Sequence, residues 1–431
     1  MQHARLSRLQ KIAGPVDEAL VARLPLKYAQ VIADGCAGEG AAQVSSERAE
    51  AARGYCLGLG ALPGELLAAA SDRAIDVLIV ATRRVMGDAG AEAAGQDAEL
   101  RRNAVDGLGG VCAALHAVGA LGAEQMQRAF DAVMGAFGDY AMDNRGDVGS
   151  WVRESAMSVG AALVRLQLQQ SSASGASELE SMCAQIFPVL VKQAVEKIDR
   201  LRGHAGTILQ SLLHNDPPLP GIPDAEAILA AVPAGTVMNW QSSKDSFPPL
   251  VGLLATEAYH YPVLSGLVVS VGGLTESLLK HGRDELMTQL EEAEDPVSKH
   301  AFGEIWGKIA FFWNSFLVAF TVAGSPKARG KRAEKRPKSH IFRSKKWSEK
   351  RPKSELGKNW ILTGRAFCVQ EALVQRVAES LLRLLRESGN ETRVVIPTLK
   401  TLEFLLESMI GLEELQPPEH QVTIASIDDL R

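Results

Sequence analysis

The chain has 431 residues, of which 46% are hydrophobic, 23% charged and 5% aromatic. Alanine, leucine and glycine are plentiful and β-branched runs are short, so the composition supplies ample material for a core and argues against a sheet-rich protein. The net charge of −5 is unevenly spread: residues 324–358 hold 14 lysines and arginines against three glutamates, a net of +11, and the remainder carries −16. The chain is therefore an acidic body with one intensely basic segment.

The N-terminus and the cysteines argue against an extracellular protein. The first residues, Met1 to Arg5, are not followed by the apolar core of a signal peptide, so secretion is not expected. The five cysteines are too scattered for a disulfide framework or a zinc site, and they predict reduced, buried thiols in a cytosolic protein. They are Cys36, Cys56, Cys112, Cys183 and Cys368.

Apolar residues at helical spacing predict a succession of helices, and no convincing strand alternates with them. Residues 1–30 are expected to hold the end of one helical unit. Further helices are predicted over residues 41–62, 65–86, 101–118, 123–137 and 150–169, as a pair within 178–213, and over 263–280, 374–387 and 396–409. Loops are predicted at 87–95, 138–149 and 171–177, with a long irregular connection over 217–249. The predicted fold class is all-α.

An arginine followed three residues later by a small side chain recurs at intervals of 48, 52 and 49 residues. A period near fifty made of helical units is close to the ~40–47 residues of HEAT and armadillo repeats, with longer loops. We therefore predict a HEAT/armadillo-like α-solenoid of antiparallel helix pairs, an architecture that presents extended surfaces to other proteins. The recurring pairs are Arg53/Cys56, Arg101/Ala104, Arg153/Ala156 and Arg202/Ala205.

The segment from Asp147 to Ala156 indicates how such an arginine could hold neighbouring repeats together. Arg153 is expected to lie across the neighbouring unit and to pair with Asp147, while the small Ala156 lets adjacent helices approach closely. A catalytic arginine that assists phosphoryl transfer is the alternative, but every repeat would then need a nucleotide. The predicted repeat-stacking residues are Arg53, Arg101, Asp147, Arg153 and Arg202.

Two glycine-rich stretches resemble nucleotide-binding loops without meeting their requirements. Residues 58–64 follow a predicted helix instead of a strand, and their spacing is one residue too long. Residues 324–332 have five residues between the glycines instead of four, and Arg332 stands where a hydroxyl would bind magnesium. The histidines show no metal-ligand spacing, and no serine lies in a nucleophile elbow. We therefore expect no catalytic residue, no metal, no cofactor and no enzymatic activity.

Residues 303–375 differ from both flanks. The stretch 309–324 has no charge but, at 16 residues, is shorter than the ~20 of a membrane-spanning helix, so no membrane span is expected. In the basic segment 324–358 the sequence Glu-Lys-Arg-Pro-Lys-Ser occurs at 334–339 and again at 349–354, and its prolines and like charges predict disorder. The predicted domains are 1–302 with HEAT-like repeats, 303–375 as an atypical insert, and 376–431 with a final repeat and tail.

Six long stretches carry a family likeness. The longest is Tyr140–Met157, which reads Tyr-Ala-Met-Asp-Asn-Arg-Gly-Asp-Val-Gly-Ser-Trp-Val-Arg-Glu-Ser-Ala-Met. The others are residues 24–35, 196–200, 212–216, 264–277 and 395–402. Together they resemble the C-terminal part of the tubulin-folding cofactor D family, whose members are much longer HEAT and armadillo solenoids. The likeness covers about residues 24–302 and 376–406 and leaves 303–375 without a counterpart.

The resemblance implies a cytoplasmic tubulin chaperone of the microtubule cytoskeleton. Family members bind β-tubulin after the chaperonin releases it, join cofactor E with its α-tubulin, and with cofactor C promote GTP hydrolysis by tubulin. They also bind an Arf-like small GTPase. Because loops on rigid scaffolds carry function, partner contacts are expected in the turn 139–147 and the connection 217–247. The candidate partner-binding residues are Asp143, Arg145, Asp147, Trp151, Trp240 and Phe247.

The basic segment leaves an alternative function open. A HEAT-type protein-interaction or nuclear-transport adaptor could use residues 324–358 as a localisation signal or nucleic-acid patch. The chaperone interpretation, in contrast, predicts no nucleic-acid partner. A third possibility, membrane anchoring through residues 309–324, predicts that the chain sediments with membranes.

Overall fold

The computed structural model describes residues 22–36, 46–84, 97–170, 176–271, 275–292, 367–388 and 392–413. The chain divides into two compact units, residues 1–289 with 379–431 and residues 290–378. The first unit holds nearly all of the described residues. The predicted loop 87–95, the apolar stretch 309–324 and the basic segment 324–358 lie outside the described residues.

The first unit is a stack of helices, and the predicted all-α solenoid is confirmed. In chain order its helices are α3 (Leu24–Cys36), α4 (Ser46–Gly60), α5 (Gly64–Leu67), α6 (Ser71–Thr82), α7 (Ala98–Ala117), α8 (Ala123–Ala136), α9 (Gly149–Gln170), α10 (Ala176–Ala194) and α11 (Asp199–Leu213). They are followed by α12 (Ala225–Ala231), α13 (Ser243–Val251), α14 (Glu257–Val271), α15 (Glu276–Glu292), α17 (Phe367–Glu387) and α18 (Thr392–Glu413). The end of α15 and the first part of α17 belong to the second unit. Within the described residues, strands occur only in a hairpin of β1 (Met142–Asp143) and β2 (Gly146–Asp147).

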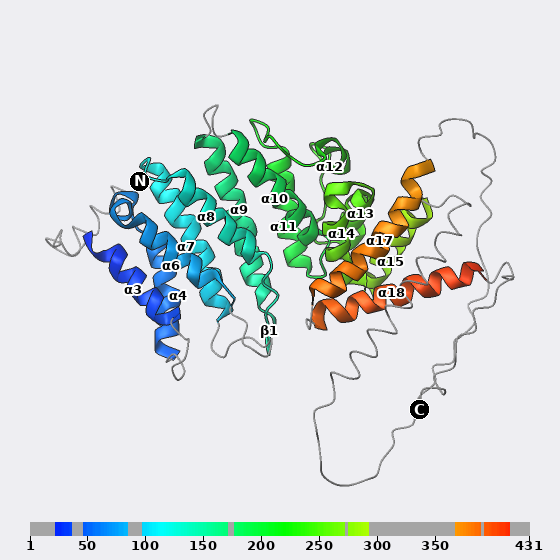
Figure 1. Ribbon diagram of the computed structural model, residues 1–431, viewed down its shortest axis with the longest axis horizontal. Coiled ribbons are helices and arrows are strands. Elements are labelled where there is room, and N and C mark those ends of the chain that lie inside the picture. Colours follow the sequence, from blue (N-terminus) through cyan, green and yellow to red (C-terminus); the bar gives the residue numbers. More distant parts are fainter. Residues whose placement is uncertain are drawn as a thin grey trace, which may run out of the picture. The chain divides into compact units, whose positions relative to one another are not determined.

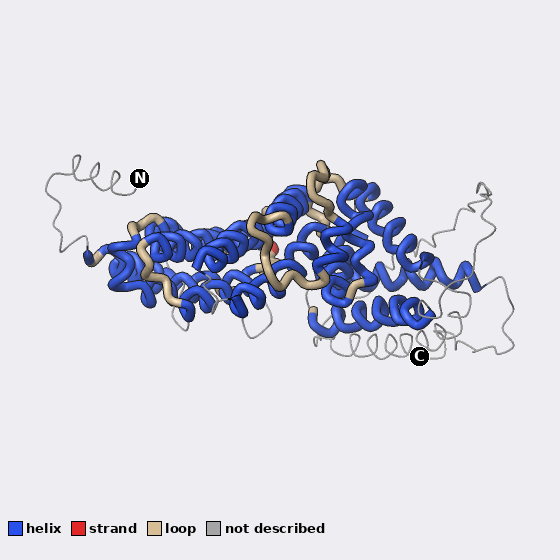
Figure 2. The backbone as a smooth tube through the Cα atoms, turned by 90° about the horizontal axis from the view of Figure 1, so that it is seen from above, coloured by secondary structure: helices blue, strands red, loops and turns tan. Residues whose placement is uncertain are grey.

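The stack has two layers of helices. One layer contains α4, α7, α9 and α11, each packed on the next (Figure 1). We call it the arginine layer because it carries the four repeated arginines. The second layer contains α3, α6, α8 and α10, and each of its helices packs on the helix that follows it in the arginine layer. From above, the two layers appear as two rows of helices in the N-terminal half of the stack (Figure 2).

The small residues of the repeat lie in the interior of the stack. All four are fully buried, which allows neighbouring helices to approach closely. They are Cys56, Ala104, Ala156 and Ala205. Cys56, Cys112 and Cys183 are buried free thiols, as predicted, whereas Cys36 is partly exposed.

Three segments differ from the predicted elements. The predicted helix 65–86 is divided into α5 and α6 by a short 3₁₀ turn at Ala68–Ala70. The predicted helix 263–280 is two helices, with α14 ending at Val271, directly before a glycine pair that lowers helix propensity. The predicted irregular connection 217–249 contains α12 and most of α13, and a second 3₁₀ turn follows it at Gly252–Ala255.

The C-terminal helix α18 packs on α14, so a segment far along the sequence joins the stack. Leu402 and Leu405 of α18 are buried, and the Arg283 guanidinium lies 4.4 Å from the ring centre of Phe404. Among the described residues, no helix combines the length and the apolar character required to cross a bilayer.

Candidate functional site

Arg53, Arg101 and Arg153 each contact the loop that precedes the next helix of the arginine layer, and Arg202 contacts the loop that precedes α13. Arg53 of α4 pairs with Asp97, the N-cap residue of α7, and with Glu99 at 3.2 Å. Arg101 of α7 binds Asp139, which precedes the hairpin and α9, with 2.6 Å between Nε and Oδ2. The sequence repeat therefore corresponds to a series of arginine contacts from one repeat to the next, and we call it the arginine ladder.

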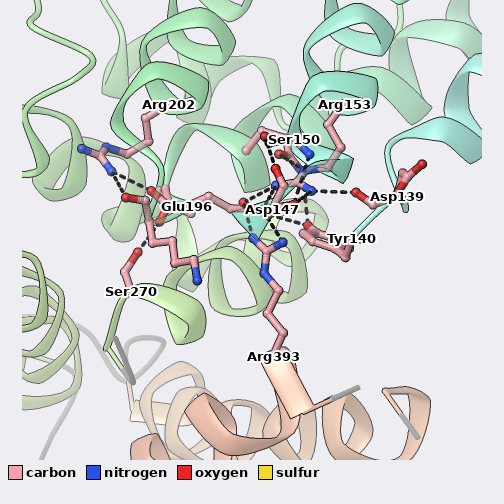
Figure 3. A network of polar contacts seen from close by, with 12 residues as sticks. Asp139, Tyr140, Asp147, Ser150, Arg153, Glu196, Arg202, Ser270 and Arg393 are labelled. Carbon is pink, nitrogen blue, oxygen red and sulfur yellow. Dashed lines mark hydrogen bonds and ion pairs between the residues drawn. The ribbon is translucent and has the colours of Figure 1, made fainter. Parts of the chain in front are cut away.

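The third step, at Arg153, is the most densely bonded. Arg153 is fully buried and donates to the Asp139 carbonyl at 2.6 Å and to Gln193 Oε1 at 3.1 Å. Its Nη2 donates at 3.1 Å to both Asp147 Oδ2 and Glu196 Oε2 (Figure 3). One guanidinium thus joins the end of the hairpin to the segment that follows α10. Such charge-assisted, planar contacts fix the angle between repeats more tightly than apolar packing alone.

Tyr140 lies inside this group of charges. Its hydroxyl donates to Glu196 Oε1, and the Arg153 guanidinium lies 4.1 Å from its ring centre. Burial, reinforced by the negative charge of Glu196, raises the pKa of Tyr140, so the phenol stays protonated. Burial opposes the charge of Lys192, 5.2 Å from the same ring, but Tyr140 and Glu196 together raise the pKa of Lys192, which remains a cation.

A fifth arginine enters the group from α18. Arg393, the second residue of that helix, has a side chain only 9% exposed. It pairs with Asp147 Oδ2 and lies 3.7 Å from Glu196 Oε2, opposite Arg153 (Figure 3). We call Tyr140, Asp147, Arg153, Glu196 and Arg393 the buried ionic cluster. The carboxylates and cations of this cluster neutralise each other, which leaves no free nucleophile or base in it.

The fourth step fixes a segment of extended chain on the stack. Arg202 of α11 donates to the carbonyls of Glu196 at 2.8 Å and Lys197 at 3.1 Å and to that of Gln241. The Trp240 indole covers Gly206 and donates to Gln210 Oε1 at 3.2 Å. Residues 236–241 therefore lie along α11.

This arrangement determines which predicted partner-binding residues reach the surface. Phe247 is fully buried and Trp240 is 5% exposed, so both belong to the interior of the stack. Asp147 is likewise engaged in the buried ionic cluster, with 8% of its side chain exposed. In this conformation these three side chains are therefore not accessible to a partner. Aromatic residues in a connection can pack in the core as well as lie on the surface.

Asp143, Arg145 and Trp151, in contrast, lie at the surface. The turn between β1 and β2 presents Arg145, 48% exposed, which pairs with Asp143 at 2.7 Å and with Glu99 at 3.4 Å. Gly146 has a φ of 103°, a conformation that glycine adopts without strain. The Arg145 guanidinium lies 4.8 Å from the ring centre of the half-buried Trp151. Hydrogen bonding to Arg145 lowers the pKa of Asp143, so the turn keeps its charges.

A shallow depression adjoins this turn, at the N-terminal ends of α7, α9 and α11. It is lined by Arg102, Asp106, Trp151, Glu154, Ser155 and Arg200. Glu154 and Arg200 pair across it. We call the turn and this depression together the hairpin surface. It combines arginines with an accessible tryptophan, the residue types that dominate binding energy at protein interfaces. Among the described residues, no three potential metal ligands are grouped together.

Sequence reasoning did not single out Asp139, Tyr140, Glu196 or Arg393. Tyr140 and Glu196 do stand at the start of two of the stretches that carry the family likeness. Asp139 belongs to the predicted polar turn, three residues before the hairpin. Arg393 has no local signal, because its partners lie about 200 residues or more away in the sequence.

A family model and a relative each match part of this chain. The model of the family described as "Tubulin folding cofactor D C terminal" matches residues 184–310 and 362–427. The gap between the two matched segments is residues 311–361. It is shorter than the stretch 303–375 that was expected from the sequence to have no counterpart in the family. A relative named "Tubulin-specific chaperone D", from Dictyostelium discoideum, is 29% identical over 161 residues, which are 33% of this chain and 11% of the relative.

This chain thus matches only about a tenth of the length of that relative. Among solved structures, an engineered protein matches 60% of this chain and 97% of its own length, with 13% identity and a TM-score of 0.32. The assignment of the fold rests on the helices described above and not on this match.

Proposed function

We propose that this chain, a partial cofactor D-like protein, binds a tubulin subunit through the hairpin surface during assembly of the αβ-tubulin heterodimer. The match of residues 184–310 and 362–427 to the C-terminal model of the cofactor D family carries this proposal. The finer assignment is to β-tubulin, in the cytoplasm, after its release from the chaperonin. Cofactors E and C and an Arf-like small GTPase are the further partners that we propose.

The role that we propose is binding without chemistry. A ladder of arginines, of which Arg101, Arg153 and Arg202 are buried, holds the helices of the arginine layer at set angles, so the surface above them is already ordered before a partner arrives. Preorganisation of this kind reduces the entropy that binding costs. A rigid solenoid that favours one conformation of its partner can promote folding or GTP hydrolysis on that partner without supplying a catalytic group. We propose that any GTP hydrolysis takes place on tubulin.

A binding assay with a matched pair of arginines tests the proposal. Arg145 and Arg128 are both partly exposed, at 48% and 33%, and each pairs with two carboxylates. Arg145 lies on the hairpin surface and Arg128 on α8 in the second layer. We expect the full chain to retain purified β-tubulin in a pull-down, Arg145→Ala to weaken binding about tenfold, and Arg128→Ala to leave it unchanged.

Each result bears on a different part of the proposal. A wild-type chain that fails to retain β-tubulin refutes the function. Equal losses from both substitutions refute the assignment to the hairpin surface. Deletion of residues 324–358 tests the adaptor alternative, because the chaperone role predicts unchanged β-tubulin binding. The adaptor role predicts loss of nuclear entry, or loss of an RNA contact that weakens steeply with salt.

A further inference from the structure

Arg393 ties the C-terminal helix α18 to the base of the hairpin. Tyr140 lies two residues before β1, and Asp147 is the last residue of β2. Arg393 contacts both: its guanidinium lies 4.7 Å from the Tyr140 ring centre and pairs with Asp147 Oδ2. The side chains at the two ends of this short hairpin are therefore bridged by one residue from a helix about 250 positions away (Figure 3).

Two guanidinium groups lie close to the Tyr140 ring. Arg153 lies 4.1 Å from the ring centre and Arg393 4.7 Å. The same two arginines share the carboxylates of Asp147 and Glu196. Stacking and ion pairing in a partly desolvated site are worth more than the same contacts in water. The docked helix α18 therefore adds directly to the free energy that keeps the hairpin ordered.

Arg393 is nevertheless the member of the buried ionic cluster that can leave at the lowest cost. Arg153 hydrogen-bonds both carboxylates on its own, whereas the Arg393 nitrogens make ion pairs without an aligned hydrogen bond. Because Lys192 also lies beside the Tyr140 ring, the two carboxylates Asp147 and Glu196 have three cations near them when Arg393 is docked. Burial, and then the charge of Arg393, lowers the pKa of Lys197, which reflects the crowding of cations at this point.

We propose that docking of α18 through Arg393 and the order of the hairpin Tyr140–Asp147 are coupled, so that the C-terminal helix regulates the hairpin surface. When Arg393 is seated, the hairpin is held from both sides and presents Arg145 in one conformation. When α18 separates, the ladder step at Arg153 survives and the hairpin loosens. Because linkage is reciprocal, a partner that orders the hairpin also favours the docked helix.

The effect of α18 on tubulin binding rests on the proposed function. The coupling itself is a property of the free chain and needs no partner for its test. Hydrogen exchange measured by mass spectrometry on the full chain reports local opening of the hairpin and of α18 separately. A failure of tubulin binding and a failure of the coupling are therefore distinguishable.

The forward experiment replaces Arg393. We expect Arg393→Met to raise the exchange rate at least tenfold in peptides that cover residues 140–148 and 392–405, and less than twofold in α7 and α8. Lys400→Met is the control, because Lys400 is an exposed cation on the same helix. Unchanged exchange in the hairpin overturns the proposal. An equal rise in α7 and α8 also overturns it, since the effect is then general destabilisation.

The reverse experiment perturbs the hairpin and reads α18. Gly146 and Gly119 both have positive φ angles, 103° and 67°, and a Cβ at either position meets no atom within 4 Å. Alanine at each position therefore introduces backbone strain of a similar kind. We expect Gly146→Ala to raise exchange in α18 at least threefold and Gly119→Ala, in the turn before α8, to leave it unchanged. No response of α18 to Gly146→Ala overturns the coupling.

Discussion

The single replacements Arg53→Met and Arg153→Met should lower the free energy of unfolding by very different amounts, although both arginines occupy the same place in the repeat. Arg53 pairs with two carboxylates at a site where 34% of its side chain is exposed. Arg153 pairs with two carboxylates at a site with no exposure, and it also bonds a carbonyl and a side-chain amide. Methionine retains much of the apolar stem and removes the charge from both sites.

The size of the difference follows from solvation. Loss of an exposed ion pair costs about 0–1 kcal/mol, because water solvates the carboxylates that remain. Loss of one partner of a buried pair costs about 3–5 kcal/mol, because the other charges stay in a medium of low dielectric constant. At the Arg153 site, Asp147 and Glu196 would retain Arg393 as their ion-pair partner. We therefore expect a gap of about 3 kcal/mol between the two variants.

Urea unfolding followed by far-ultraviolet circular dichroism measures this gap. Arg153→Lys is the informative intermediate, since it retains the charge but not the planar fork, and it should lose less stability than Arg153→Met. Two results would refute the reasoning. One is a difference of less than about 1 kcal/mol between Arg53→Met and Arg153→Met. The other is a lysine variant that is no more stable than the methionine variant.

Gly206→Ala should destabilise the chain by about 1–3 kcal/mol in urea unfolding, because the new methyl group overlaps the indole that covers this glycine. Gly135→Ala, with nothing within 4 Å of its Cβ, should instead stabilise it by about 0.5–1 kcal/mol. Burial, and then the charge of a neighbouring arginine, lowers the pKa of His204 below its usual 6.5, so the unfolded chain binds the proton first. The melting temperature should therefore fall as the pH drops below 6.5, and His204→Gln should reduce that fall. Burial raises the pKa of Cys56 to about 12. In a thiol-labelling time course at mildly alkaline pH, Cys56 should therefore react far more slowly than the partly exposed Cys36. Equal labelling rates would contradict the burial of Cys56.

The sequence alone determined the repeat and its register. A helical unit that cannot bury its apolar face alone must stack on its neighbours, so the spacing of Arg53, Arg101, Arg153 and Arg202 predicted the solenoid. The small residue three positions after each arginine lies on the buried side of the same helix, as the helical period requires. These features depend on residues close together in the chain, so the periodicity of the residues is sufficient to predict them.

Only the tertiary structure decided which charged and aromatic groups meet. Trp240 and Phe247 could face a partner or the core, and the choice depends on the return of residues 236–241 along α11. Likewise, nothing near Arg393 in the sequence indicates that it reaches Asp147 and Glu196. Helical spacing constrains the face on which a side chain lies, but a contact across hundreds of residues depends on the packing of whole helices, here α18 on α14.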